Sequence, residues 1–269
     1  MLMRLLAEPP FRILTRAALK YLPTSLDTKV KWELSTRPAY LLGVYEAAKQ
    51  AKREGRIGIE VIEFGVAGGT GLLELQRIAE MVERETGVFI KVIGFDMGNE
   101  GLPSFIGDHR DHPDQWKPGD FKMDEAALRA KLDHTRTTLL IGNVSETVFQ
   151  YARDIHENSV GFISFDMDLY SSTRDALKIF SCTDVLAHVP LYFDDIEFIF
   201  NYSEAGELAA IEEYNGTHWE TACIDQWYGI KEGRPFPERG FLEKMRVHHS
   251  FSDIENIALH RESVHLPLS

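Results

Sequence analysis

The chain has 269 residues, of which 44% are hydrophobic and 26% charged, so it can fold as one large α/β domain or two small ones. Its net charge of −13 argues against binding to a nucleic-acid backbone. Cys182 and Cys223 form neither a disulfide framework nor a zinc-binding pattern, and the apolar runs are too short for a signal peptide or a membrane span. We therefore expect a cytoplasmic protein with no membrane partner.

Strand and helix patterns alternate along the chain from residue 59 onward. Helices are predicted at 10–21, 38–54, 70–85, 123–133, 145–156, 171–181 and 204–214. Strands are predicted at 59–64, 89–95, 137–141, 160–165 and 189–193, with weaker signals at 217–224 and 256–266. This alternation predicts a parallel, doubly wound sheet, in which ligands bind beyond the carboxyl ends of the strands.

The charge is distributed unevenly between the two ends of the chain. Residues 1–60 carry 11 Lys and Arg against 6 Asp and Glu, a net +5, whereas the remainder carries 18 against 36, a net −18. Together with the helical patterns, this predicts an N-terminal helical cap or lid at 1–56, which could also contact a second copy in a homo-oligomer. The main domain is predicted at 57–269. Its acidic excess suits a cation or a cationic ligand, although solubility alone also explains it.

A glycine-rich turn follows the first predicted strand, in "EFGVAGGTGL" (63–72). The pattern E/D-x-G-x-G-x-G is met by Glu63, Gly65, Ala67 and Gly69, with alanine in the middle position. This is the pattern that binds S-adenosylmethionine, whereas the dinucleotide pattern G-x-G-x-x-G is not met. A tight turn from strand to helix without any ligand is the structural alternative.

Two further strand ends carry candidate cofactor residues. Asp96, in "GFDMGNEGLP", ends the second strand, where an acid can bind the ribose hydroxyls of a nucleoside. Gly142, Asn143 and Val144 end the third strand, where an adenine ring would rest. Asn143 is equally well placed to be the N-cap of the next helix.

Carboxylates occur in pairs after the fourth and fifth strands. Asp166 and Asp168 lie in "FDMDLYSSTRDAL", and Asp194 and Asp195 lie in "LYFDDIE". Two such pairs at one edge of a sheet indicate that something positive lies between them, although aspartates also cap helices.

These motifs, in the same order along residues 37–215, resemble class I S-adenosylmethionine-dependent methyltransferases. More narrowly, they resemble the macrocin O-methyltransferase type, which comprises metal-dependent enzymes that methylate sugar hydroxyls in natural-product biosynthesis. The stretch "GELAAIEEYN" (206–215) shares this resemblance. It implies a Rossmann-like α/β fold with a mostly parallel seven-stranded sheet, helices on both faces and an N-terminal helical extension.

The resemblance also implies a set of functional residues. Mg²⁺ would be bound by Asp166, Asp194 and Asp195, with Asp166 also beside S-adenosylmethionine and part of the catalytic site. The metal would lower the pKa of an acceptor hydroxyl and align it with the methyl group. Apart from the resemblance, the candidate general bases are Asp168, which is close to the proposed metal ligands in sequence, and the two histidines of "GDHRDHPDQW", His109 and His112. The acceptor would be a small molecule with hydroxyl groups. Residues 97–120 and the tail after 215, where the substrate regions would lie, do not indicate a specific acceptor.

Two other functions stay open at this stage. An NAD-dependent oxidoreductase is disfavoured by the glycine spacing. A non-catalytic binding protein with the same fold is disfavoured because all four carboxylates at the strand ends are present.

Overall fold

The computed structural model describes residues 11–154 and 157–260, and its centre is a seven-stranded sheet of order β3-β2-β1-β4-β5-β7-β6. β7 runs antiparallel to both of its neighbours, and the other strands are parallel to one another. The predicted mostly parallel Rossmann-like sheet is therefore confirmed. The strands are β1 (Gly58–Phe64), β2 (Phe89–Asp96), β3 (Thr137–Ile141), β4 (Ser159–Phe165), β5 (His188–Phe193), β6 (Ala222–Gln226) and β7 (Met245–Ser250).

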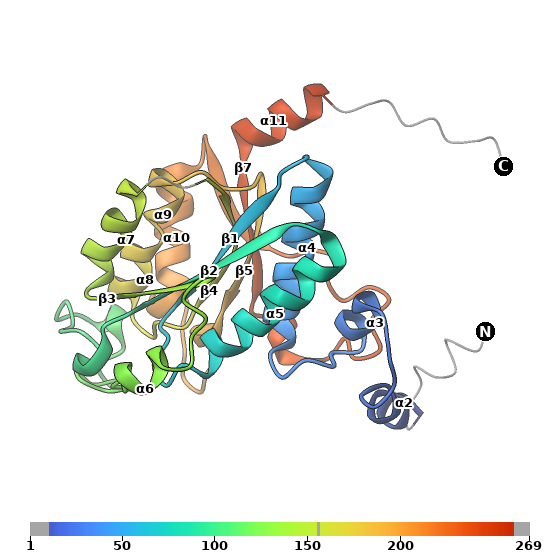
Figure 1. Cartoon of the computed structure of the whole chain (residues 1–269). Coiled ribbons are helices and arrows are strands. Elements are labelled where there is room, and N and C mark those ends of the chain that lie inside the picture. Colours follow the sequence, from blue (N-terminus) through green and yellow to red (C-terminus); the bar gives the residue numbers. More distant parts are fainter. Residues whose placement is uncertain (1–10, 155–156, 261–269) are drawn as a thin grey trace.

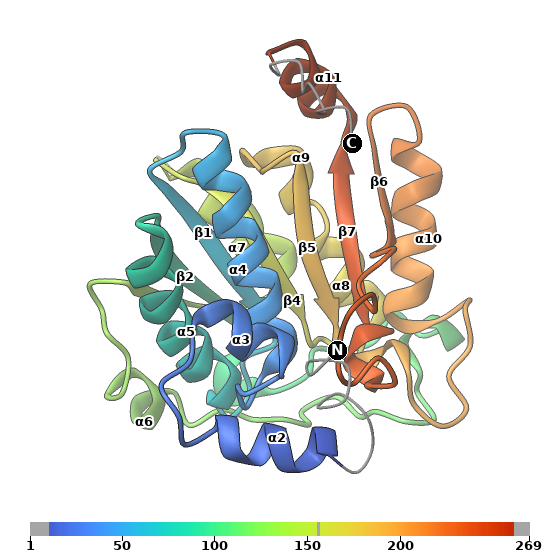
Figure 2. The same ribbon diagram turned by 90° about the vertical axis from the view of Figure 1, so that its right-hand side faces the viewer.

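Helices cover both faces of this sheet, as Figure 1 shows. One face carries α4 (Pro38–Arg53) and α5 (Thr70–Thr86), and the other carries α7 (Val144–Arg153), α8 (Tyr170–Ala176) and α10 (Gly206–His218). The helix α2 (Phe11–Leu19) lies beyond the carboxyl ends of the parallel strands (Figure 2). The other α-helices of the described residues are α3 (Leu26–Lys31), α6 (Glu125–Arg129), α9 (Ile179–Cys182) and α11 (Phe251–His260).

Most of the predicted elements lie within a few residues of the observed ones, but the C-terminal end differs. The strand predicted at 256–266 is wrong: residues up to 260 belong to α11, and 261–266 lie outside the described residues. The last strand of the chain is instead β7, which lies between β5 and the edge strand β6 and in which Met245 and Val247 alternate with polar residues. That alternation gives a weak apolar signal. The helix predicted at 171–181 is also split, into α8 and α9.

A ladder of four phenylalanines crosses the middle of the sheet at its carboxyl edge. Phe64 stacks on Phe95 and on Phe165, with ring centroids 4.6 and 5.4 Å apart, and Phe165 stacks on Phe193 at 4.6 Å. The four rings are essentially inaccessible to solvent and face one another in register across β2, β1, β4 and β5. The residue after each ring therefore reaches the same edge of the sheet: Gly65, Asp96, Asp166 and Asp194.

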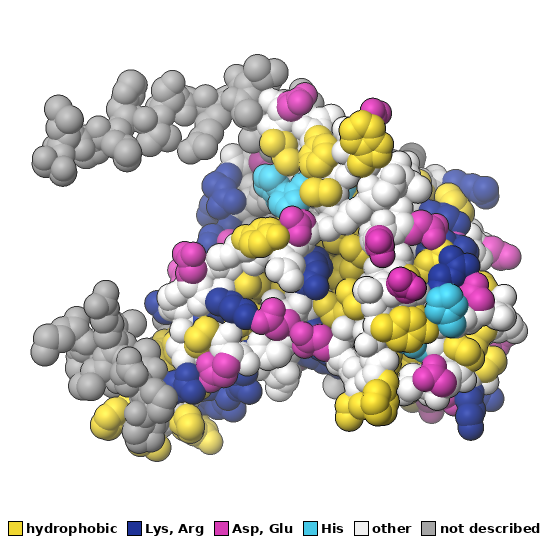
Figure 3. Space-filling model, turned by 180° about the vertical axis from the view of Figure 1, so that it is seen from behind, with side chains coloured by type: hydrophobic (Ala, Val, Ile, Leu, Met, Phe, Trp, Pro, Cys, Tyr) yellow, Lys and Arg dark blue, Asp and Glu magenta, His cyan; other side chains and the backbone are white. Residues whose placement is uncertain are grey.

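The N-terminal part of the chain contributes to the same core. α4 packs against β1, β4 and β5, and eleven of its residues are buried. The domain division predicted at residue 56 stays a prediction. Within the described residues, no helix is long and apolar enough to span a membrane. On the face shown in Figure 3, acidic and basic side chains are intermixed, without a continuous basic stripe over the described residues.

Candidate functional site

A cavity of about 280 Å³ opens beyond the carboxyl ends of β1, β2, β3 and β4. The structure brings eight of the predicted site residues to its wall: Gly65, Ala67, Asp96, Gly142, Asn143, Val144, Asp166 and Asp168. The rest of the wall is mostly apolar and includes Phe95, Met97, Leu102, Pro103, Phe121 and Met167. A site with apolar walls and a few polar groups is typical for a small organic ligand.

The glycine-rich turn approaches the end of β4 closely. Gly65 has a φ of +83°, and a Cβ at this position would lie 1.7 Å from the carbonyl oxygen of Asp166, so only glycine fits. Gly69 has a φ of +81° and precedes the first turn of α5. Ala67 adopts a left-handed conformation with a φ of +43°, although it is not glycine. The turn therefore holds its backbone close to the cavity.

Glu63 is the second-last residue of β1, next to this loop, and its side chain is buried. Its Oε1 accepts a hydrogen bond of 2.6 Å from the Tyr40 hydroxyl, which in turn accepts one of 2.9 Å from Ser164. Its Oε2 is also buried and has no hydrogen-bond partner among the described residues. Burial raises the pKa of Glu63 to about 8, while the Tyr40 hydrogen bond opposes the shift. Gly71 leaves room for this carboxylate, because a Cβ there would lie 1.9 Å from Oε1.

Asp96 anchors the backbone on both sides of the cavity. Its Oδ2 accepts a hydrogen bond of 2.7 Å from the Ala67 amide, and its Oδ1 accepts one of 2.6 Å from the Gly98 amide. Each carboxylate oxygen can accept a second bond, so Asp96 can still bind a ligand hydroxyl. Burial raises the pKa of Asp96, and the hydrogen bonds from the two amides oppose that shift.

Asn143 is the N-cap of α7 and accepts a hydrogen bond of 3.0 Å from the amide of Ser145. This is one of the two roles predicted for it from the sequence.

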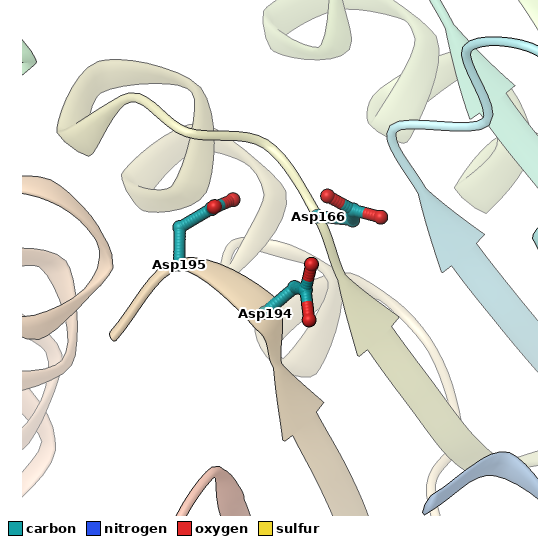
Figure 4. A group of neighbouring side chains, drawn as sticks. All are labelled: Asp166, Asp194 and Asp195. Atoms are coloured by element: carbon teal, nitrogen blue, oxygen red, sulfur yellow. The ribbon is translucent and has the colours of Figure 1, made fainter. Parts of the chain in front are cut away.

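Three carboxylates converge beside the cavity, as Figure 4 shows. One oxygen each from Asp166, Asp194 and Asp195 lies within 4.8 Å of the other two. Burial, followed by repulsion from the other two aspartates, raises the pKa of Asp166 to about 7, and burial raises that of Asp195 to about 6. The positive charge in contact with the cluster is Lys244, whose Nζ lies 3.4 Å from Oδ1 of Asp194, an oxygen that also accepts a hydrogen bond from Tyr192. Oxygen-only clusters of this kind suit a hard divalent cation.

Asp168 stands next to the cluster without belonging to it. It lines the cavity, is 8% exposed and has a φ of +62°, an unusual conformation for aspartate. Its amide donates a hydrogen bond of 3.1 Å to Oδ2 of Asp195. Burial, followed by repulsion from Asp195, raises its pKa to about 8. Its carboxylate is therefore held near the cation site and the cavity together.

Glu207 is a buried acid that the sequence analysis did not assign. It lies in the first turn of α10, and its Oε2 accepts a hydrogen bond of 3.0 Å from the amide of Asp195. Its Oε1 is buried without a hydrogen-bond partner in the described part of the chain, and burial raises its pKa well above the usual range. The available signal was an acid at the start of a helix directly after the cluster, within the family-like stretch 206–215.

The two candidate histidines of the 97–120 segment occupy different environments. His109 is exposed, stacks on Tyr202 at 6.2 Å and does not line the cavity, so its catalytic role stays a prediction. His112 is buried, with its ring 5.0 Å from that of Phe198.

The same segment is fastened to the rest of the molecule by a buried aspartate. Asp111 accepts hydrogen bonds from the amide and hydroxyl of Ser171, at 2.8 and 3.0 Å, and from the amide of Ile106 at 2.9 Å. The segment is therefore tied to the start of α8.

Together, the sheet order, the glycine-rich turn after β1 and the antiparallel β7 define a Rossmann-like fold of the class I methyltransferase type. No family model matches the chain, and no curated protein matches it. Among solved structures it is similar to the calicheamicin methyltransferase CalS11, with a TM-score of 0.56 and 20% identity over 91% of this chain and 94% of that one. It is also similar to the O-methyltransferase NovP, with a TM-score of 0.50 and 15% identity over 79% of each chain. At these identities the likeness establishes the fold.

Proposed function

We propose that this protein is an S-adenosylmethionine-dependent O-methyltransferase that transfers a methyl group to a hydroxyl of a sugar or natural product with the help of Mg²⁺. One observation carries the proposal: Asp166 belongs both to the wall of the cavity and to the three-carboxylate cluster. A cofactor in the cavity and a cation in the cluster would therefore be neighbours. The methyltransferase fold supports this reading.

The cavity residues, together with Glu63 beside the glycine-rich turn, suit S-adenosylmethionine in three ways. The apolar wall, with Val144 and Phe95, accepts an adenine ring, and Asp96 offers carboxylate oxygens to the ribose hydroxyls. The unpartnered Oε2 of Glu63, next to the glycine-rich turn, is an acceptor that suits the ammonium group of the methionine part.

The cluster of Asp166, Asp194 and Asp195 would hold Mg²⁺, which would lower the pKa of the acceptor hydroxyl and orient its oxygen. Asp168 is then placed to accept the hydroxyl proton. As the new bond from oxygen to methyl carbon forms, the bond from that carbon to sulfur breaks. The products are the methyl ether, neutral S-adenosylhomocysteine and protonated Asp168. No covalent enzyme intermediate is needed.

Calorimetry tests the cofactor and metal assignments separately. Wild type should bind S-adenosylhomocysteine, and Asp96→Asn should bind it about 5- to 150-fold more weakly, because a charge-assisted hydrogen bond is lost. Asp166→Asn should lose the Mg²⁺-dependent rise in melting temperature and keep S-adenosylhomocysteine binding within about twofold. Binding of NAD in place of S-adenosylhomocysteine would refute the proposal.

A methyl-transfer assay over a panel of hydroxylated glycosides tests the chemistry. Asp168→Asn should lower kcat by about 10²- to 10⁴-fold, because the general base is removed, and leave S-adenosylhomocysteine affinity unchanged. Chelator should abolish turnover in wild type. Turnover that survives chelator would show that the carboxylates are not metal ligands.

A further inference from the structure

Arg37 is a half-buried cation at the start of α4 that the proposed mechanism does not use. We propose that its guanidinium binds the α-carboxylate of the methionine part of S-adenosylmethionine and so positions the cofactor. This inference rests on the proposed function.

Arg37 lies near acids of two groups, Glu63 beside the glycine-rich turn and the aspartates of the three-carboxylate cluster. Its guanidinium carbon lies 5.4 Å from the ring centroid of Tyr40, whose hydroxyl donates to Glu63. Burial lowers the pKa of Arg37, but attraction to Tyr40, Glu63, Asp166 and Asp194 more than offsets this and raises it. The guanidinium therefore interacts electrostatically with Glu63 and with two aspartates of the cluster.

The guanidinium is available for a ligand. Within the described residues, no hydrogen bond and no ion pair within 4.0 Å joins it to another group. Lys244, which contacts the cluster, is already engaged with the side chain and the carbonyl oxygen of Asp194. Arg37 is also the N-cap residue of α4, so the partial positive charge of that helix N-terminus lies in the same place.

S-adenosylmethionine requires such a cation. Its methionine part carries a carboxylate, and the acids Glu63 and Asp166 near the glycine-rich turn would repel that group. Its ammonium group is attracted by the same acids. A planar guanidinium binds a carboxylate through two parallel hydrogen bonds, which fixes orientation as well as charge. Arg37 thus complements the acids, so that each charge of the amino-acid part has an opposite partner.

Three ligands separate this role from general neutralisation of the acids. S-adenosylhomocysteine carries the carboxylate, decarboxylated S-adenosylhomocysteine lacks only that group, and 5′-methylthioadenosine lacks the amino-acid group. In calorimetry, Arg37→Met should weaken S-adenosylhomocysteine about 10- to 100-fold and leave the other two ligands within about twofold. Arg37→Lys should restore part of the loss, because it restores the charge without the planar geometry.

Arg77→Met is the matched control, because Arg77 is an exposed arginine on α5, paired with Glu74. It should bind all three ligands like wild type. Equal weakening of all three ligands by Arg37→Met, or unchanged S-adenosylhomocysteine binding, would overturn the assignment. A weakening of Mg²⁺ binding by Arg37→Met as large as the weakening of S-adenosylhomocysteine binding would also overturn it. The Mg²⁺-dependent rise in melting temperature measures the Mg²⁺ affinity. Failure of wild type to bind S-adenosylhomocysteine would instead refute the proposed function itself.

Discussion

The proposed cofactor side of the site, around Asp96, and its proposed metal side, the cluster of Asp166, Asp194 and Asp195, hold their carboxylates in opposite ways. On the cofactor side, both oxygens of Asp96 accept backbone hydrogen bonds, and Asn143 caps its helix. On the proposed metal side, Asp166 and Asp195 are half-buried beside a third aspartate, and Lys244 is in contact with that group. Asp96 and Asn143 thus have hydrogen-bond partners without a ligand, whereas the three aspartates repel one another, as we expect of a group that binds a cation.

Both sides rest on the phenylalanine ladder, so its removal is expected to have the largest effect. Phe165 occupies the centre, with Phe64 and Phe193 stacked on either side. Phe165→Ala should lower the free energy of unfolding by about 3–5 kcal/mol, because it leaves a cavity in a fully buried stack. Urea denaturation measures this change.

The control for the ladder is Phe200→Ala, which removes a phenylalanine that is 85% exposed. Its effect on unfolding should stay within about 0.5 kcal/mol. A loss below about 1 kcal/mol for Phe165→Ala would show that the ladder does not support the site.

The sheet and the strand-end acids were predictable because their signals are local. An apolar run followed by an acid, as at Phe165 and Asp166, marks both a buried strand and its carboxyl end. The surroundings of Glu207 and Arg37 were not predictable in this way, because they involve residues far away in the chain. β7 was missed because polar residues separate its apolar ones. The predicted N-terminal cap includes α4, which packs against β1, β4 and β5 and so forms part of the core.

The pH dependence of stability sharpens the comparison. The pKa values of Asp166, Asp168 and Glu63 are raised to about 7, 8 and 8, so the folded protein binds more protons than the unfolded chain near neutral pH. Stability contributed by these groups is therefore lost as pH rises through those values. Without Mg²⁺, the free energy of unfolding should fall by about 4 kcal/mol between roughly pH 6.5 and 8.5.

Denaturation at both pH values, with and without Mg²⁺, measures this difference. Saturating Mg²⁺ should remove the part of the fall that comes from Asp166 and Asp168, because a cation beside them favours their ionised forms, and Asp166→Asn should reduce the fall in the metal-free protein. A metal-free protein that is equally stable at both pH values would contradict the view that the metal side is incomplete.

The smallest effect is expected on the cofactor side, at Asn143. Its Oδ1 accepts hydrogen bonds from the amide and the hydroxyl of Ser145, at 3.0 and 2.8 Å, at the start of α7. Asn143→Ala should lower the free energy of unfolding by about 1 kcal/mol, the usual cost of losing an N-cap, whereas Asn143→Asp keeps an acceptor and should lose less. Because no titrating or metal-binding group takes part in this cap, urea denaturation should give the same loss at either pH and with or without Mg²⁺. A loss that changes with Mg²⁺ would mean that the two sides are coupled rather than independently built.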